Sequence, residues 1–387
     1  MTHRLMQAAL LLTVAACGSA PSSTAAQARS GARPFSVTEV ARFSTPWAMD
    51  FLPGSGVRMT TKALITEKEG KLWLVDTVNG SRQRVTGVPR VAVGGQGGLG
   101  DVVADPDFAG NQRIYLSFVE AGPNGTKGAV LGYGRLLFTS AASPGAPAGV
   151  SLDGFKVIWR QTPKVGGEGH FSHRIAFAPD GTIFLTSGER EKMQPAQDLR
   201  SDLGKIHHLT REGAPAPGNP WARLGGRAAN YWSMGHRNLL GIAFAPDGRL
   251  WETEMGPKGG DELNLVLRGA NYGWPLASYG SHYSGADIPN DHRGRRFEEP
   301  KIWWNPSISP GGLLIYSGDL FKGWKGDALI PALSGEALIR IDIAGDQARK
   351  ADQWPMGQRI RAVDQGPRGE IYLLEDEGRL LRLEPKR

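Results

Sequence analysis

A short two-strand unit recurs along this chain, and it constrains the fold more than any other feature. The letters IAFAPDG at 175–181 lead into an apolar run at 183–185, and the same letters at 242–248 lead into 250–251. Proline presets φ and glycine accepts a positive φ, so each Pro-Asp-Gly turn suits two antiparallel strands. Similar strand pairs occur at 63–66 and 70–76, 102–104 and 113–116, 313–316 and 328–330, and 360–363 and 371–374. About six such pairs, roughly one per 60 residues, predict an all-β, six-bladed β-propeller; five or seven blades remain open.

Composition agrees with this fold class and narrows the possible partners. The chain has 53 Gly and 26 Pro among 387 residues and no long segment with a 3.6-residue apolar period. We expect residues 36–387 to form the propeller, with the strand at 379–383 closing the ring against the other chain end. The net charge is +7, but no dense Lys/Arg run is present, so we expect no nucleic-acid partner. A basic cleft for an anionic cofactor is the more specific interpretation.

The N-terminal segment is typical of an exported lipoprotein. Residues 1–17 combine a short basic start with an apolar run and end in Val-Ala-Ala-Cys, which resembles a lipobox. We therefore expect lipidation at Cys17, with ordinary secretion as the alternative, and a flexible tether over 18–35. Cys17 is the only cysteine, so the mature fold has no internal disulfide. The predicted location is the periplasm, with membrane contact only through the lipid and a weak preference for the outer membrane.

Several polar residues stand directly before predicted inner strands, where propeller loops converge. Gln96 lies within the glycine-rich run 94–100, for which a plain turn is the competing interpretation. His170 follows Gly-Gly-Glu-Gly and is a candidate general base, with His173 and His236 as competitors.

Two arginine-containing segments and one acidic segment add further candidates. Arg237-Asn238 offers a guanidinium and an amide beside a similar loop, and Arg359 and Arg361 share one face of a strand. That pair suits a polycarboxylate ligand, although a solvated strand face would also explain it. The acidic run at 261–264 offers hard oxygen donors suited to Ca²⁺, and a surface acidic turn explains it equally well.

Taken in order, four motifs give the chain a family resemblance. They are GHRN at 235–238, GDELN at 260–264, NYGWP at 271–275 and GQRIR at 357–361. Together they resemble the soluble PQQ-dependent sugar dehydrogenases, specifically the aldose sugar dehydrogenase branch, and the similarity runs from Thr45 to the last strand. The resemblance implies a six-bladed propeller that oxidises the C1 hydroxyl of aldoses to lactones, with hydride passing to PQQ.

The resemblance also implies roles for particular residues. His170 would take the proton from the sugar hydroxyl, and Arg237 would lie near the quinone oxygen where negative charge develops. Gly256 and Pro257 would hold the Ca²⁺ of the cofactor through backbone carbonyls. Glu262 and Tyr272 would bind a second, structural Ca²⁺, the tyrosine through its backbone carbonyl. The cofactor-contacting positions would be Gln96, Arg237, Asn238, Tyr283, Arg359 and Arg361.

Three departures from the family pattern matter for the site. Gly169 stands where an aspartate would orient the catalytic histidine, which leaves Glu168 or a backbone carbonyl to do so. No lysine occurs at 333–336, where the family often has one that binds the cofactor, so Lys325 or another cation would substitute. His173 replaces a small residue and is expected to narrow the substrate pocket.

Two other functions remain open. A Ca²⁺-dependent propeller lactonase would also use a channel metal and a histidine, but it would not need the arginine pair. A non-catalytic propeller that binds glycans or proteins would keep the scaffold alone. The sequence names neither the aldose nor the electron acceptor, and it leaves monomer and homodimer open.

Overall fold

The computed structural model describes residues 32–54, 61–139, 149–292, 294 and 297–386. The predicted signal segment, Cys17 and most of the predicted tether lie outside these residues. Within the described residues, no helix is long and apolar enough to cross a membrane.

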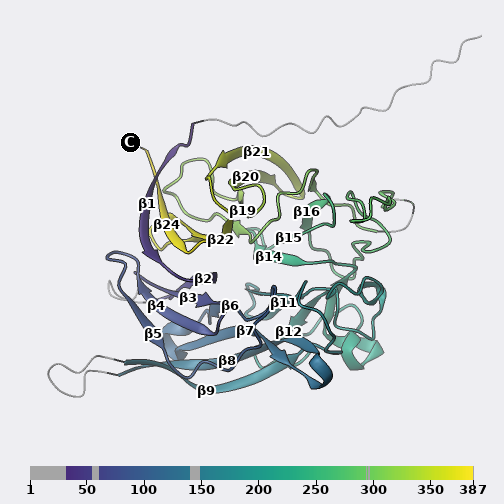
Figure 1. Cartoon of the computed structure of the whole chain (residues 1–387), viewed down its shortest axis with the longest axis horizontal. Coiled ribbons are helices and arrows are strands. Elements are labelled where there is room, and N and C mark those ends of the chain that lie inside the picture. The colour runs from purple at the N-terminus through teal and green to yellow at the C-terminus, as the bar shows by residue number, and fades with distance from the viewer. Residues whose placement is uncertain (1–31, 55–60, 140–148, 293, 295–296, 387) are drawn as a thin grey trace, which may run out of the picture.

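Six four-stranded antiparallel sheets form the blades of a β-propeller (Figure 1). The first two blades comprise β2 (Pro46–Phe51), β3 (Lys62–Glu67), β4 (Lys71–Asp76) and β5 (Arg82–Val85), then β6 (Leu99–Ala104), β7 (Arg113–Ala121), β8 (Lys127–Thr139) and β9 (Gly149–Arg160). The next two comprise β10 (Ser172–Phe177), β11 (Ile183–Ser187), β12 (Lys205–Leu209) and β13 (Tyr231–Met234), then β14 (Leu239–Phe244), β15 (Leu250–Glu254), β16 (Asp261–Leu265) and β17 (Ile302–Trp304). The fifth comprises β18 (Leu314–Ile315), β19 (Ala328–Ala332), β20 (Ala337–Ala344) and β21 (Gln347–Pro355).

The sixth blade joins the two ends of the described chain. Its strands are β22 (Ile360–Gln365), β23 (Ile371–Glu375), β24 (Arg379–Pro385) and β1 (Phe35–Arg42), in the order β1-β24-β23-β22. Phe35 pairs with Pro385 and Arg42 with Arg379, and Figure 1 shows the purple β1 beside the yellow β24. The predicted closing role of the last strand is therefore confirmed.

In the part of the chain that the structure describes, helical structure is confined to short turns in the connecting segments. These are α1 (Phe108–Asn111), η1 (Pro123–Gly125), η2 (Gln194–Gln197), η3 (Ala222–Leu224) and η4 (Gly226–Asn230). The all-β, six-bladed prediction is thus confirmed. In the first blade, however, the predicted pair at 63–66 and 70–76 forms the middle hairpin, β3 and β4. Its inner strand is β2, which has no Pro-Asp-Gly turn after it.

The hydrophobic core lies between neighbouring blades. Leu64 and Leu72 of the first blade pack with Ile114 and Leu116 of the second in one buried cluster. Each sheet is therefore covered on both faces, which explains why the middle strands read as continuous apolar runs. The inner strands ring a central cavity of about 220 Å³, and every blade contributes to its lining. This ring brings loops that are distant in sequence to one mouth.

Candidate active site

A second cavity of about 220 Å³ gathers residues predicted from separate motifs. Its lining includes Gln96, Ser172, His173, Arg359 and Arg361. These residues come from three different blades and meet because they stand at or just before inner strands. The structure therefore brings together the glycine-rich run, the His170 loop and the arginine pair, as the sequence predicted.

His170 lies beside this cavity in a constrained backbone. Its φ is +48°, in the left-handed region, and the residue is buried. The His170 N–H donates to Gln96 Oε1 at 2.8 Å, which ties the two loops together. The ring contacts a buried carboxylate, because Nδ1 lies 2.5 Å from Glu189 Oε1. A carboxylate can only accept, so Nδ1 carries the proton and Nε2 is left as the basic nitrogen.

Glu189, and not Glu168, orients the candidate base. Glu168 is half-exposed and forms an ion pair with Lys127 at 2.6 Å, so that expectation was wrong. Burial raises the pKa of Glu189, but the hydrogen bond and charge of His170 outweigh it, and the pKa lies below its usual range. A signal for Glu189 was present in the sequence, because an acidic residue stands two positions after β11. That strand pairs with β10, which follows His170.

A buried arginine holds the backbone of the same loop. Arg190 is fully buried and donates to the carbonyls of Gly167 at 2.6 Å and Gly169 at 2.8 Å. Its guanidinium lies 3.6 Å from the ring centre of Phe171. Arg190 therefore fixes the glycine-rich loop around His170. Neither Glu189 nor Arg190 was identified from the sequence.

Arg237 and Asn238 stand just before β14 of the next blade and contact two residues that line the cavity, Met255 and Ser172 respectively. Arg237 donates to the Gly256 carbonyl at 2.5 Å, and its second amino group lies 3.3 Å from the Tyr283 hydroxyl. Asn238 is buried and accepts a hydrogen bond from Ser172 Oγ at 3.2 Å. The carbonyl of Gly256, expected to bind Ca²⁺, thus already accepts from Arg237. A carbonyl oxygen has two lone pairs, so one acceptor position remains. Pro257 is buried next to it.

The arginine pair shares one carboxylate within the protein. Asp376 accepts from Arg359 Nε at 3.0 Å and from Arg361 at 2.9 and 2.8 Å. Both guanidinium groups therefore lie on one face, as predicted, and one carboxylate neutralises only part of their charge. Burial raises the pKa of Asp376, but the charges and hydrogen bonds of Arg361 and Arg359 outweigh burial and hold that pKa below its usual range.

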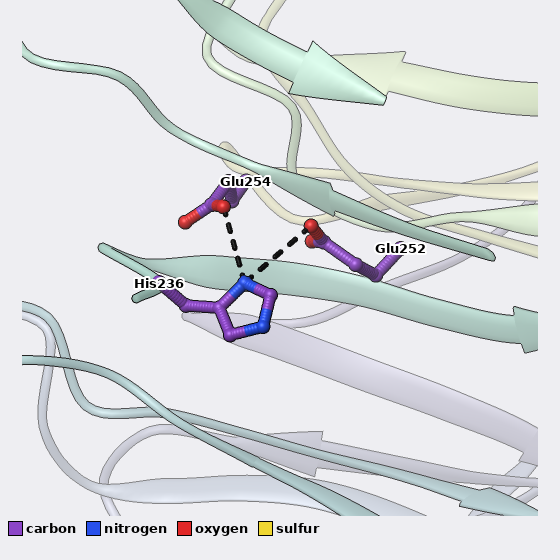
Figure 2. Close-up of side chains that lie close together, drawn as sticks. All are labelled: His236, Glu252 and Glu254. Carbon is purple, nitrogen blue, oxygen red and sulfur yellow. Dashed lines mark hydrogen bonds and ion pairs between the residues drawn. The ribbon is translucent and has the colours of Figure 1, made fainter. Parts of the chain in front are cut away.

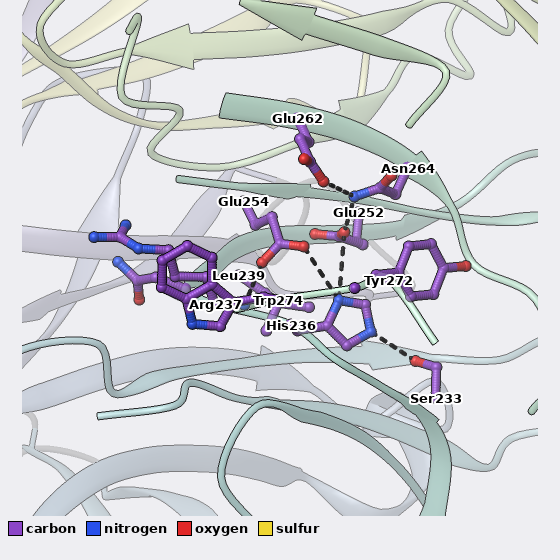
Figure 3. A network of polar contacts seen from close by, with 12 residues as sticks. Ser233, His236, Arg237, Leu239, Glu252, Glu254, Glu262, Asn264, Tyr272 and Trp274 are labelled. Carbon is purple, nitrogen blue, oxygen red and sulfur yellow. Dashed lines mark hydrogen bonds and ion pairs between the residues drawn. The ribbon is translucent and has the colours of Figure 1, made fainter. Parts of the chain in front are cut away.

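A buried acidic cluster lies on β15 and β16. His236 Nδ1 lies 3.3 Å from Glu254 Oε1 and 3.8 Å from Glu252 Oε1, and the three ligand atoms lie within 4.8 Å of one another (Figure 2). Glu262 is paired with Glu254 across the two strands, and Asn264 donates to Glu252 at 2.7 Å and to Glu262 at 3.1 Å (Figure 3). Burial, and then the charge of Glu254, raise the pKa of Glu252 and of Glu262 well above the usual range.

This acidic cluster differs in membership from the predicted donor set. Asp261 belongs to another environment, because its carboxylate accepts from Gly256 N–H and from Ser307, Ile308 and Ser309. The Tyr272 ring stacks on His236 at 4.5 Å and its hydroxyl is bonded to Leu265 and Leu267, so only its backbone carbonyl is left to face a cation. Glu252 and Glu254, two apart on one strand face, were missed.

The structure also shows where the two other departures from the family pattern lie, the missing lysine at 333–336 and His173. Lys325 pairs with Asp319 at 2.9 Å on the surface and does not line the cavity. His173 lines the cavity, as expected of a residue that narrows it, and its ring stacks on Trp47 at 5.2 Å. Burial and the charge of Arg174 lower the pKa of His173 to about 3, so its ring is neutral near pH 7.

The fold and this site define a class of propeller with a histidine–carboxylate pair beside a cationic cavity. The glucose/sorbosone dehydrogenase family model matches residues 43–382, and the chain belongs to this family. Aldose sugar dehydrogenase YliI of Escherichia coli is 38% identical over 349 residues, covering 88% of this chain and 90% of that protein.

Solved structures of sugar dehydrogenases have the same fold as this chain. A crystal structure of a glucose dehydrogenase superposes with a TM-score of 0.83 and 40% identity, covering 91% of this chain and 100% of that one. The PQQ-bound aldose sugar dehydrogenase of Streptomyces coelicolor superposes with a TM-score of 0.69 and 28% identity, covering 91% and 98% of the two chains.

Proposed function

We propose that this protein oxidises the C1 hydroxyl of aldose sugars to the lactone, with PQQ and Ca²⁺ as cofactors. The observation that carries the proposal is the His170–Glu189 pair beside a cavity lined by Arg359 and Arg361. A lactonase would not need the arginine pair. Support also comes from the family and from the PQQ-bound relative of similar fold.

The residues present fit a planar, polyanionic cofactor. Arg359 and Arg361 share a single carboxylate and so retain positive charge toward the cavity. Arg237 Nε is buried and has no hydrogen-bond partner in the described structure, so this N–H is free for an acceptor on a ligand. When bound, PQQ supplies a quinone that accepts the hydride, and its Ca²⁺ polarises that quinone.

The side chains would carry out the proton transfer, the charge stabilisation and the positioning. Glu189 holds the Nδ1 proton of His170, so Nε2 can take the proton of the sugar hydroxyl and the carboxylate stabilises the imidazolium that forms. Arg237 would supply positive charge where negative charge develops. Gln96 fixes the backbone of His170, and Asn238 fixes Ser172 at the cavity wall.

The acidic cluster fits a structural Ca²⁺. Glu252 Oε2 and Asn264 Oδ1 are buried acceptors without a hydrogen-bond partner in the described structure. Oxygen acceptors of this kind suit a hard cation. We therefore extend the proposed second calcium site from Glu262 and the Tyr272 carbonyl to include Glu252 and Glu254.

Reconstitution tests the proposed function. The apoprotein is loaded with PQQ and CaCl₂, and reduction of an artificial dye is followed with a panel of aldoses. We expect reduction that requires PQQ, Ca²⁺ and sugar together. His170→Ala should abolish turnover while PQQ binding persists. Failure of every aldose despite full loading would refute the oxidoreductase; lactone hydrolysis by the same sample would identify the lactonase instead.

We further propose export and lipid attachment at Cys17, from the sequence alone. Labelling of cells with radioactive palmitate should mark the wild-type protein, and Cys17→Ser should be unlabelled and should leave the membrane fraction. Equal labelling of both proteins would contradict the assignment.

A further inference from the structure

Lys68 stands at the mouth of the cavity, directly after β3. Its N–H donates to the Thr45 carbonyl at 3.0 Å, and its carbonyl accepts from Leu99 N–H at 3.0 Å. Gly98 approaches so closely that a Cβ there would lie 2.3 Å from the Lys68 carbonyl oxygen. The backbone of Lys68 is therefore fixed by both neighbouring segments, and its side chain starts from a defined position.

The ammonium group of Lys68 has unused donors. Nζ donates to the Gly95 carbonyl at 2.6 Å, whereas the neighbouring Lys71 is paired with Glu67. Among the described residues, Lys68 has no carboxylate within ion-pair distance. An ammonium group carries three N–H donors, so two are available to a ligand.

Lys68, Arg359 and Arg361 line the same cavity. The strands they adjoin belong to the first and sixth blades, which are neighbours in the ring. Of the carboxylates in the described residues, Asp376 alone pairs with members of this group, Arg359 and Arg361, which leaves a surplus of positive charge at the mouth. A ligand with several carboxylates would neutralise that surplus.

We propose that Lys68 binds a carboxylate of the cofactor and so supplies the cation that 333–336 lacks. The inference rests on the proposed function and names a further cofactor-binding residue for it. Lys325, the alternative lysine, is paired with Asp319 outside the cavity. A competing role for Lys68 is to brace the glycine-rich run through Gly95 alone.

Titration of the full-length apoprotein with PQQ at fixed CaCl₂ tests the proposal, with quenching of tryptophan fluorescence as the readout. Lys68→Gln keeps an N–H donor for the Gly95 carbonyl but removes the charge, and Lys68→Met removes both. We expect Kd for PQQ to rise about tenfold or more in each, as is typical for loss of a charged hydrogen bond. Lys68→Arg should bind nearly as the wild type does, and Lys325→Met should be unchanged.

The uncharged trimethyl ester of PQQ separates charge recognition from bracing. We expect wild type and Lys68→Gln to bind this ester equally. An equal loss of affinity for PQQ and for the ester would assign bracing only and overturn the proposal. If wild type binds PQQ and both uncharged variants bind it within about twofold, the Lys68 proposal alone fails. If wild type binds no PQQ, the proposed function fails with it.

Discussion

Glu189→Gln is a near-isosteric change with a large expected effect on catalysis. Glu189 Oε2 accepts two backbone N–H groups, those of Lys192 and Met193, both at 2.6 Å. An amide has one acceptor oxygen, so these two donors should hold the oxygen on their side. The amide NH₂ would then face His170 Nδ1, which must become an acceptor. The ring proton would move to Nε2, and the base would be lost.

The size of the effect follows from the role of a general base. Such a base contributes roughly 10²- to 10⁴-fold to the rate. We therefore expect kcat/KM for aldose oxidation to fall by about 10²- to 10⁴-fold, which corresponds to about 3–5 kcal/mol in the barrier. PQQ binding should change far less, because the Glu189 carboxylate is directed to His170 Nδ1 and to the N–H groups of Lys192 and Met193.

Steady-state dye reduction by the reconstituted enzyme measures this change, with PQQ titration alongside. Glu168→Gln is the matched control, since it neutralises a half-exposed carboxylate that pairs with Lys127. We expect this control to retain nearly wild-type kcat/KM. Wild-type kcat/KM in Glu189→Gln, or an equal loss in Glu168→Gln, would refute the argument.

Two further predictions concern stability. Ca²⁺ should raise the unfolding temperature of the wild type, measured by scanning fluorimetry during a Ca²⁺ titration. Glu252→Gln should reduce that rise, because it removes one of the buried, mutually repelling carboxylates. Asp247→Asn, at an exposed carboxylate, is the control, and an equal response of the two variants would contradict the site. His207 has its pKa lowered from 6.5 to about 3 by burial and then by the charge of Lys205. The unfolded chain therefore binds a proton that the folded chain does not, and stability falls as the pH drops below about 6.5. His207→Phe should make that fall shallower by up to about 1.4 kcal/mol per pH unit in denaturant titrations, and an unchanged slope would argue against a neutral buried ring.

Much of the scaffold was predictable because hairpins are local. The turns at 179–181, 246–248 and 367–369 each join two strands that the structure contains. Alternating apolar runs and turn residues specify a hairpin within about a dozen residues, without reference to the rest of the chain. The inner strand β2 was missed because it lacks such a turn.

The candidate site was only partly predictable. His170, Gln96 and the arginine pair were found because glycine-rich loops and paired arginines are visible in the sequence. The partner of His170 was expected to be Glu168 or a backbone carbonyl, yet it is Glu189, 19 residues later. The strand at β11 returns to the same end of the blade, so a residue distant in sequence lies closer to the ring than the neighbouring side chain does.

The sequence by itself determined the hairpin units and several of the polar groups at their ends, and it favoured six blades. Tertiary structure alone decided which of those groups meet: Glu189 with His170, Asp376 with both arginines, and Glu252 and Glu254 with His236. The physical reason is that turn chemistry is local, whereas the mouth of a propeller forms only when six blades close into a ring. Closure of the ring also decides which charges are buried and paired. It places Lys68 at the cavity with two ammonium N–H donors that have no partner in the described structure.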